Sequence, residues 1–163
     1  MKGVAERYRG LVRRLGHQRW FARVGRAVVP LDRTLQRRTG GRLTILGHHV
    51  LPQLLLTTTG RTSGEPRTVP LLYAAGPQPG EYVVVASNWG QAHHPAWSAN
   101  LLAHPEASVR IGDRTVPVRA ELAEGAERDA LWSRVVEIWP AYDTYADRSG
   151  RTLRVFLLRA THR

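Results

Sequence analysis

"LLLTTTGRTSGEPRTVPLLY", residues 54–73, decides the fold, because two β-rich runs in it meet at a glycine-flanked turn. Val, Leu, Thr and Tyr dominate both runs, and these residue types favour strands. Gly60 and Gly64 enclose the turn, and glycine accepts the positive φ angles that tight turns need. We therefore predict an antiparallel hairpin with strands at residues 53–59 and 66–74.

The same β-rich texture returns further along the chain. Four more candidate strands lie at residues 81–87, 107–111, 115–122 and 153–160. Helical signals at residues 94–105 and 124–140 interrupt these strands and stop at prolines. The crossover helix between successive strands that a doubly wound fold needs is missing. Six strands at this spacing predict an α+β fold with a closed or partly closed barrel.

The positive charge is concentrated near the N-terminus. The formal net charge is +11, and residues 1–50 carry twelve Lys and Arg against two acidic residues. Apolar residues recur at helical spacing within residues 4–28, and arginines fill the positions between them. We therefore divide the chain into a basic amphipathic helical segment, residues 1–46, and a barrel domain, residues 47–163.

Two interpretations of this basic segment stay open, and a third is disfavoured. An apolar face with Trp and Phe under an arginine face suits an anionic membrane surface, but a helix packed on its own domain fits the pattern as well. A nucleic-acid arm is disfavoured because no known binding motif is present. No secretory pattern and no apolar run of ~20 residues occurs. We expect a cytoplasmic protein, or one peripheral at the inner face of the cell membrane.

Several chemistries are excluded by what the sequence lacks. The chain has no cysteine, which removes disulfides, thiolate nucleophiles and cysteine-ligated metals. The pairs His48-His49 and His93-His94 lack the spacing of metal ligands, so no metal site is predicted. G-x-S-x-G, G-x-G-x-x-G and Walker motifs are absent, which leaves serine hydrolysis and ordinary NAD or ATP sites unsupported.

The hairpin turn carries the donors of an anion site. Positive φ angles at both glycines would point consecutive backbone N–H groups into one concavity. Arg61 and Arg67 add planar donors suited to phosphate or carboxylate. Thr59, Thr62 and Ser63 add hydroxyl groups. An ordinary polar hairpin remains the alternative.

A second cluster suggests a pocket for a planar ligand. Ser87 and Asn88 follow a buried run, and Trp97 and Asn100 lie three residues apart on one face of the next helix. The indole supplies contact area and the amide supplies a donor and an acceptor, so the pair can flank a heterocycle. A core tryptophan with a capping asparagine is the alternative.

A third cluster is an aromatic row near the C-terminus. Trp139, Tyr142 and Tyr145 repeat every three residues, a spacing that more often marks a core. Pro140 and Asp143 interrupt the segment, however, so we expect a lid rather than a core helix.

Taken in order, these stretches resemble the deazaflavin-dependent nitroreductase family. The resemblance rests on "TTGRTSGEPR", "HPAWSANL", "WPAYDTYADR" and "RVFLLRA" and covers roughly residues 50–160. It implies a six-stranded split β-barrel of the FMN-binding type, with two or three flanking helices and an N-terminal amphipathic helix. It also implies coenzyme F420, a deazaflavin with a phosphate and a glutamate tail. The implied reaction is hydride transfer from the reduced coenzyme to a quinone, an enone or a nitro compound.

The resemblance also implies a role for each candidate residue. Those implied to bind the coenzyme are Arg61, Thr62, Ser63, Gly64, Arg67, Val69, Pro70, Leu71, Ala86, Ser87, Asn88, Trp97 and Asn100. Those implied to meet the acceptor are Leu72, Trp139, Tyr142 and Tyr145. Tyr142, Tyr145 or Ser87 would supply the catalytic hydrogen bond or proton.

Four positions depart from the family pattern. Thr62 and Asn88 stand where lysines are common, and Leu72 and Trp139 stand where tyrosines are found. The strength of tail binding and the reduction of nitro compounds therefore stay open. FMN in the same barrel, or a non-catalytic protein that stores the coenzyme, remains an alternative. Neither the small-molecule acceptor nor the oligomeric state follows from the sequence.

Overall fold

Seven strands form one antiparallel sheet in the computed structural model, which describes residues 10–38 and 51–161. The strands are β1 (Gln53–Thr59), β2 (Pro66–Leu72), β3 (Ala74–Ala75), β4 (Glu81–Val85), β5 (Glu106–Ile111), β6 (Arg114–Leu122) and β7 (Val155–Ala160). Their order across the sheet is β2-β1-β5-β6-β7-β4-β3, and every neighbouring pair is antiparallel.

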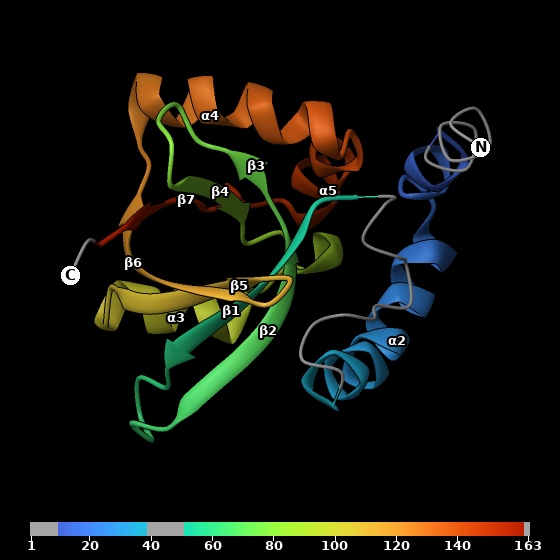
Figure 1. Cartoon of the computed structure of the whole chain (residues 1–163). Helices are drawn as coiled ribbons and strands as arrows, with labels where there is room; N and C mark the ends of the chain where they lie inside the picture. The colour runs from blue at the N-terminus through green and yellow to red at the C-terminus, as the bar shows by residue number, and fades with distance from the viewer. Residues whose placement is uncertain (1–9, 39–50, 162–163) are drawn as a thin grey trace, which may run out of the picture.

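The sheet curls until its two edges approach each other, as Figure 1 shows. Strands β2 and β3 lie at opposite ends of the strand order, yet only Tyr73 separates them along the chain. Consecutive Cα atoms are about 3.8 Å apart, so such a short connection holds the two edges side by side. Strand β2 also contacts β4. The predicted α+β fold with a partly closed antiparallel barrel is confirmed.

The predicted number of strands was wrong by one. Residues 66–74 were expected to form a single strand, but Tyr73 interrupts them and donates its N–H to the Pro52 carbonyl oxygen at 3.2 Å. Strand β2 pairs with β1, whereas β3 pairs with β4. Local composition does not reveal this break, because both pieces have the same β-rich character and differ only in their distant partners.

The helices cover the sheet on both faces. Helices α3 (Ala96–Ala103) and α4 (Gly125–Ile138) follow the two predicted helical stretches. Alternate residues of β4 point to opposite faces, so Val84 packs in the cluster that contains α3 and Val83 in the cluster that contains α4. A 3₁₀ turn, η1 (Asn88–Gly90), joins β4 to α3.

The aromatic row is buried where α4 ends and α5 begins and does not form a lid, which corrects our expectation. Helix α5 (Ala141–Ser149) holds Tyr142 and Tyr145, which belong to the hydrophobic core together with Trp139. Pro140 takes the N-cap position of α5, so it starts this helix instead of interrupting it.

The N-terminal region consists of two helical stretches instead of the single amphipathic helix that we expected. Residues 10–15 are helical, a turn follows, and helix α2 (Arg19–Arg38) continues past Pro30. Residues 4–9, the start of the expected helix, lie outside the described residues. Among the helices that the structure describes, none is long and apolar enough to cross a membrane.

One side of this region packs on the rest of the molecule. Val12 and Ala22 are buried, and Arg13 donates from Nη2 to the Glu137 carbonyl oxygen at 2.6 Å. Arg148 of α5 donates from Nη2 to the His17 carbonyl oxygen at 2.8 Å. Packing on its own domain therefore accounts for the buried part of the apolar face. Among the side chains that the structure describes, the large apolar ones that stay exposed on these stretches are Leu11, Trp20, Val24 and Leu31.

Candidate functional site

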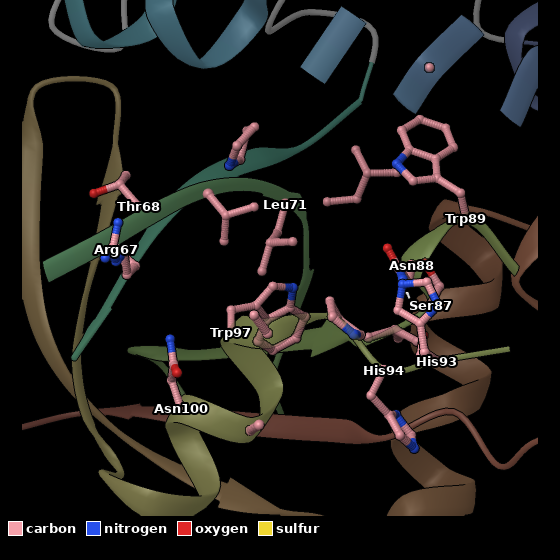
Figure 2. A pocket seen from close by; sticks show the side chains of 18 of the residues that line it. Arg67, Thr68, Leu71, Ser87, Asn88, Trp89, His93, His94, Trp97 and Asn100 are labelled. Atoms are coloured by element: carbon pink, nitrogen blue, oxygen red, sulfur yellow. Dashed lines mark hydrogen bonds between the residues drawn. The ribbon is translucent and has the colours of Figure 1, made fainter. Parts of the chain in front are cut away.

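A cavity of about 1280 Å³ opens between the hairpin β1–β2, the loop after β4, helix α3, helix α2 and the aromatic row. Figure 2 shows Arg67 and Asn100 toward one end, and Ser87, Asn88 and Trp89 toward the other. Leu71 and Trp97 lie between the two groups. The cavity therefore has a polar end at the hairpin turn and an aromatic end near α2 and α5.

The structure brings fifteen of the predicted site residues to this cavity. They are Arg61, Thr62, Ser63, Arg67, Val69, Pro70, Leu71, Leu72, Ser87, Asn88, Trp97, Asn100, Trp139, Tyr142 and Tyr145. Gly64 and Ala86 do not line it. Ala86 is fully buried in the core beside α3, and Gly64 shapes the turn with a φ of +70°.

The backbone of the hairpin turn is mostly satisfied within the protein, which corrects the expected row of free N–H groups. Gly60 donates to the Glu65 carbonyl oxygen and Gly64 donates to the Gly60 carbonyl oxygen, both at 2.8 Å. Positive φ is needed only at Gly64. Space at Gly60 is tight, because a Cβ there would lie 2.5 Å from Ser63 Oγ and 3.1 Å from the Glu65 carbonyl oxygen. The anion donors at this end are therefore the side chains of Arg61 and Arg67 with the neighbouring hydroxyls.

Asn100 holds this turn in place from helix α3. Its side-chain Oδ1 accepts from the Arg61 backbone N–H at 3.1 Å, and its Nδ2 donates to Thr58 Oγ1 at 3.0 Å. The residue is 5% exposed. Sequence reasoning placed this amide against a ligand, but the structure shows that it bridges to the strand end and to the turn. Asn100 lines the cavity while its amide is engaged by the protein.

The middle of the cavity is a flat apolar slot. Val69, Pro70 and Leu71 of β2 form one side, and Trp97 of α3 lies opposite Leu71 (Figure 2). Trp97 packs against Phe156 with ring centroids 5.8 Å apart, so the core beneath fixes the indole. Both walls belong to regular elements, β2 and α3.

The loop after β4 forms the opposite end. Asn88 and Trp89 have positive φ angles of 46° and 57°, which residues with a Cβ rarely adopt. Asn88 donates from Nδ2 to the His93 carbonyl oxygen at 3.1 Å. Sequence reasoning missed Trp89, His93 and His94 as cavity residues. The run Trp89-Gly90 directly after the polar pair was the available signal for a tight turn.

The aromatic wall is closely packed, and its side chains are largely shielded from solvent. Trp139, Tyr142 and Tyr145 are 4%, 5% and 1% exposed. The Tyr142 and Tyr145 rings lie 6.4 Å apart, and Trp89 lies 6.5 Å from Tyr145. Burial, with a smaller contribution from the neighbouring Tyr145, raises the pKa of Tyr142 well above its ordinary value. Tyr142 therefore keeps its proton at neutral pH.

Helix α2 supplies a wall that sequence reasoning assigned to a separate segment. Phe21, Val24, Gly25 and Val28 line the cavity, and Phe21 lies 6.3 Å from the Trp139 ring. The apolar spacing of this helix was visible in the sequence, but its partner was not.

No metal centre accompanies the cavity within residues 10–38 and 51–161. No group of three or more His, Asp or Glu side chains there has the arrangement to hold a metal ion. The polar chemistry of the cavity therefore comes from guanidinium, hydroxyl, amide and imidazole groups.

Comparisons with known proteins agree with this geometry. A model of the F420H(2)-dependent quinone reductase family matches residues 24–160. An F420H(2)-dependent quinone reductase of Mycobacterium tuberculosis is 34% identical over 147 residues, covering 86% of this chain and 95% of that protein. A solved F420-H2 dependent reductase is 39% identical with a TM-score of 0.61, covering 66% of this chain and 94% of that one. Another solved structure, described as a domain-swapped dimer, is 38% identical with a TM-score of 0.62, covering 80% and 99%.

Proposed function

The chain belongs to the F420H(2)-dependent quinone reductase family, and from that premise we propose how its own residues divide the work of an F420H2-dependent reductase. The cofactor is coenzyme F420. We place its anionic tail at the hairpin turn, its ring in the slot between β2 and α3, and the acceptor at the aromatic end. When bound, the reduced coenzyme supplies a hydride to the acceptor.

The donors at the turn fit the anionic tail. Arg61 and Arg67 line the cavity beside the hydroxyls of Thr62 and Ser63. Guanidinium groups bind phosphate and carboxylate through paired, charge-assisted N–H donors. Thr62 carries no charge, so the two arginines hold the tail with help only from hydroxyls at this turn.

The slot fits a planar ring. Val69, Pro70 and Leu71 present an apolar surface opposite Trp97, and Ser87 adds a polar edge. Apolar walls bind the ring by excluding water, and a few polar groups at the rim orient it. Asn100 contributes to this site indirectly, because its amide holds the hairpin turn in place.

The aromatic end receives the acceptor. Leu72, Trp139, Tyr142 and Tyr145 surround it with apolar area, which suits a quinone. Tyr142 keeps its proton at neutral pH, as an ordinary tyrosine does, and burial raises its pKa further, so it acts as a hydrogen-bond donor to the acceptor oxygen and not as a base. Ser87 is the second candidate for this hydrogen bond, and Tyr145 is the third. Enones and nitro compounds are narrower acceptor classes that the same wall admits.

The single observation that carries these assignments is that one continuous cavity joins an arginine-rich end to an aromatic end. The test is a titration of the purified protein with oxidised F420, followed by coenzyme fluorescence, and then a turnover assay with F420H2 and a water-soluble benzoquinone. We expect saturable binding and quinone-dependent oxidation of the coenzyme.

FMN is the matched control ligand, because it has a flat ring and a phosphate but no glutamate tail. We expect weaker binding of FMN than of F420. Equal affinity for the two ligands would contradict the tail assignment, and absence of F420 binding at micromolar protein would contradict the placement of the coenzyme in this cavity.

We also propose that the exposed part of the N-terminal region meets an anionic membrane surface. Leu11, Trp20 and Leu31 are 53%, 53% and 68% exposed, with the exposed arginines Arg19 and Arg23 beside them. Apolar side chains flanked by arginines favour anionic lipid over neutral lipid. Replacing Trp20 and Leu31 by serine should abolish cosedimentation with anionic vesicles. Undiminished cosedimentation of this variant would sink the proposal.

We propose that the chain divides between residues 46 and 47 and that the two parts share the cavity. Residues 1–46 form the basic segment and residues 47–163 form the barrel, but α2 of the first part supplies cavity residues to the second. A full binding site therefore needs both parts.

A further inference from the structure

The loop between β4 and α3 holds Trp89 in a backbone conformation that a tryptophan disfavours. Asn88 and Trp89 both have left-handed backbone angles, with φ of 46° and 57°. Residues with a Cβ are strained there, and such strain persists only where surrounding contacts impose it. Bonds inside the loop, such as Gly90 N–H to the Ser87 carbonyl oxygen at 3.0 Å, close single turns. They do not join the two ends of the loop to the rest of the molecule.

One backbone bond, from the Ala86 N–H to the Arg154 carbonyl oxygen at 2.9 Å, joins the loop entry to the connection before β7, and the side chain of Arg151 makes the rest of the connection. Arg151 follows Gly150, the left-handed C-cap of α5, and lies in the connection to β7. Its guanidinium reaches five partners on residues 86–94, which are 57 to 65 positions away in the chain. Nη2 donates to the carbonyl oxygens of Ala86 and Ser87 at 3.1 Å and of His93 at 3.2 Å.

The remaining two nitrogens of this guanidinium contact the part of the loop that leads into α3. Nε donates to the Gln91 carbonyl oxygen at 3.0 Å, and Nη1 lies 2.9 Å from His94 Nδ1. Since arginine has only donors, His94 Nδ1 accepts and its ring proton sits on Nε2. One planar side chain thus holds both the entry and the exit of the loop that carries Ser87, Asn88 and Trp89.

We propose that Arg151 is a positioning residue for the acceptor end of the site. This inference rests on the proposed function, because it concerns the same cavity. Arg151 keeps Ser87, Asn88 and Trp89 at the cavity wall, whereas the hairpin turn at the other end is held separately by Asn100. Loss of Arg151 therefore disturbs the geometry of the reaction more than the binding of the coenzyme tail.

The charge of Arg151 alone does not account for this role. A lysine retains the charge but presents three donors from one nitrogen, so it cannot make the Nε bond to Gln91 and the Nη1 contact with His94 together with the three bonds that Nη2 makes. Arg154 provides a matched control, since it lies in the same connection and makes a single side-chain contact, from Nη1 to Ser98 Oγ at 3.3 Å. Replacing Arg154 removes the same charge from the same connection.

The experiment compares Arg151→Gln, Arg151→Lys and Arg154→Gln in the full chain. We expect kcat with F420H2 and a water-soluble benzoquinone to fall about tenfold to hundredfold in Arg151→Gln, the scale of a small misplacement at a reacting centre. The Kd for oxidised F420 should stay within about threefold of wild type, because the tail is bound at the other end. Arg154→Gln should retain wild-type kcat.

A second measurement does not depend on turnover. Amide hydrogen exchange should quicken in residues 86–94 of Arg151→Gln and Arg151→Lys, while residues 60–65 should stay at the wild-type rate. Equal exchange in residues 86–94 of wild type and the variants overturns the positioning role. Arg151→Lys supplies this comparison by itself if Arg151→Gln is too unstable to be measured. A wild-type protein that does not oxidise F420H2 would instead count against the proposed function.

Discussion

At the scale of single residues, the two ends of the cavity differ in the hydrogen-bonding groups that their side chains present. Asn100 hydrogen-bonds Thr58 and the Arg61 backbone through its amide, so it holds the turn while it lines the cavity. Arg61 and Arg67 keep their guanidinium groups at the cavity. Tyr142, buried and with a raised pKa, keeps a proton to share in a hydrogen bond. These assignments lead to two predictions about individual side chains.

Replacing both Arg61 and Arg67 by alanine should raise the Kd for F420 by at least about tenfold, the scale of losing charge-assisted hydrogen bonds. The measurement is a fluorescence titration with oxidised coenzyme. Arg110→Ala is the control, because Arg110 lies on β5, bonds to the Gly112 carbonyl oxygen and does not line the cavity. A double variant with the Kd of Arg110→Ala would place the tail elsewhere.

His94 should make the fold less stable in acid. Burial lowers the pKa of its imidazole, and the charges of Arg151 and Arg154 lower it further. The unfolded chain then binds the proton more readily than the folded chain. The neutral ring therefore stabilises the fold fully above its ordinary pKa of about 6.5, and this stability is lost as the pH falls below that value.

The measurement for His94 is the free energy of unfolding in urea from about pH 5 to about pH 8. The His94→Gln variant should show a shallower decline in acid than wild type. His104→Gln, at an exposed position, should decline as wild type does. Identical curves for wild type and His94→Gln would contradict the prediction.

At the scale of elements, two glycine–tryptophan contacts join the N-terminal helical stretches to the aromatic end. A Cβ at Gly16 would overlap the Trp139 ring, and a Cβ at Gly25 would overlap the Trp89 ring. Gly25 and Trp89 both line the cavity. Helix α2 therefore approaches closely because of a missing side chain, and this approach sets the width of the cavity at that end.

Alanine should have opposite effects at Gly10 and Gly25, which both lie in the N-terminal helical stretches. At Gly10, where an added Cβ meets no atom within 4 Å, alanine should be neutral or raise the melting temperature, because it is the better helix former. At Gly25, alanine should lower the melting temperature and raise the KM for quinone, because the Trp89 ring must move. Thermal unfolding and steady-state kinetics check both. Matching effects at the two positions would rule out the close approach.

At the scale of the whole molecule, the curled sheet brings the ends of the strand order together, and the cavity lies between β2, α3, α2 and the loop after β4. The connection at Tyr73 makes β2 and β3 neighbours around the barrel. Helix α3 covers one face of the sheet, and α4 and α5 pack against the other (Figure 1). The molecule also carries a net charge of +11, which attracts an anionic coenzyme from a distance.

Salt should therefore weaken F420 binding. Counterions screen attraction between the tail and the arginines over a Debye length of about 10 Å at 0.1 M salt. The Kd should rise steadily with sodium chloride in wild type and rise less steeply in the Arg61→Ala/Arg67→Ala variant. Titrations across a salt series measure both slopes. A Kd that is independent of salt would mean that the tail is not bound by exposed charges.

Much of the fold and the site was predictable from local patterns. Composition, spacing and backbone preferences within a few residues predict the hairpin and the two helices that end near prolines, α3 and α4. They also predict the hydrogen-bond donors of the hairpin turn. Most predicted site residues also line the cavity, because their motifs lie at strand and helix ends that the barrel gathers. The acidic-poor, arginine-rich N-terminal region was equally visible in the sequence.

The sequence by itself determined most of the elements, the arginine- and hydroxyl-rich character of the turn and the aromatic character of the opposite wall, because these depend on neighbouring residues. Only the tertiary structure decided that residues 66–74 form two strands, that Asn100 serves the turn, and that α2 closes the cavity. It also brought Arg151 to a loop 57 to 65 residues away. The physical reason is that hydrogen bonds and packing contacts form between residues that are close in space. Local periodicity in the sequence does not show which distant residues the fold brings together.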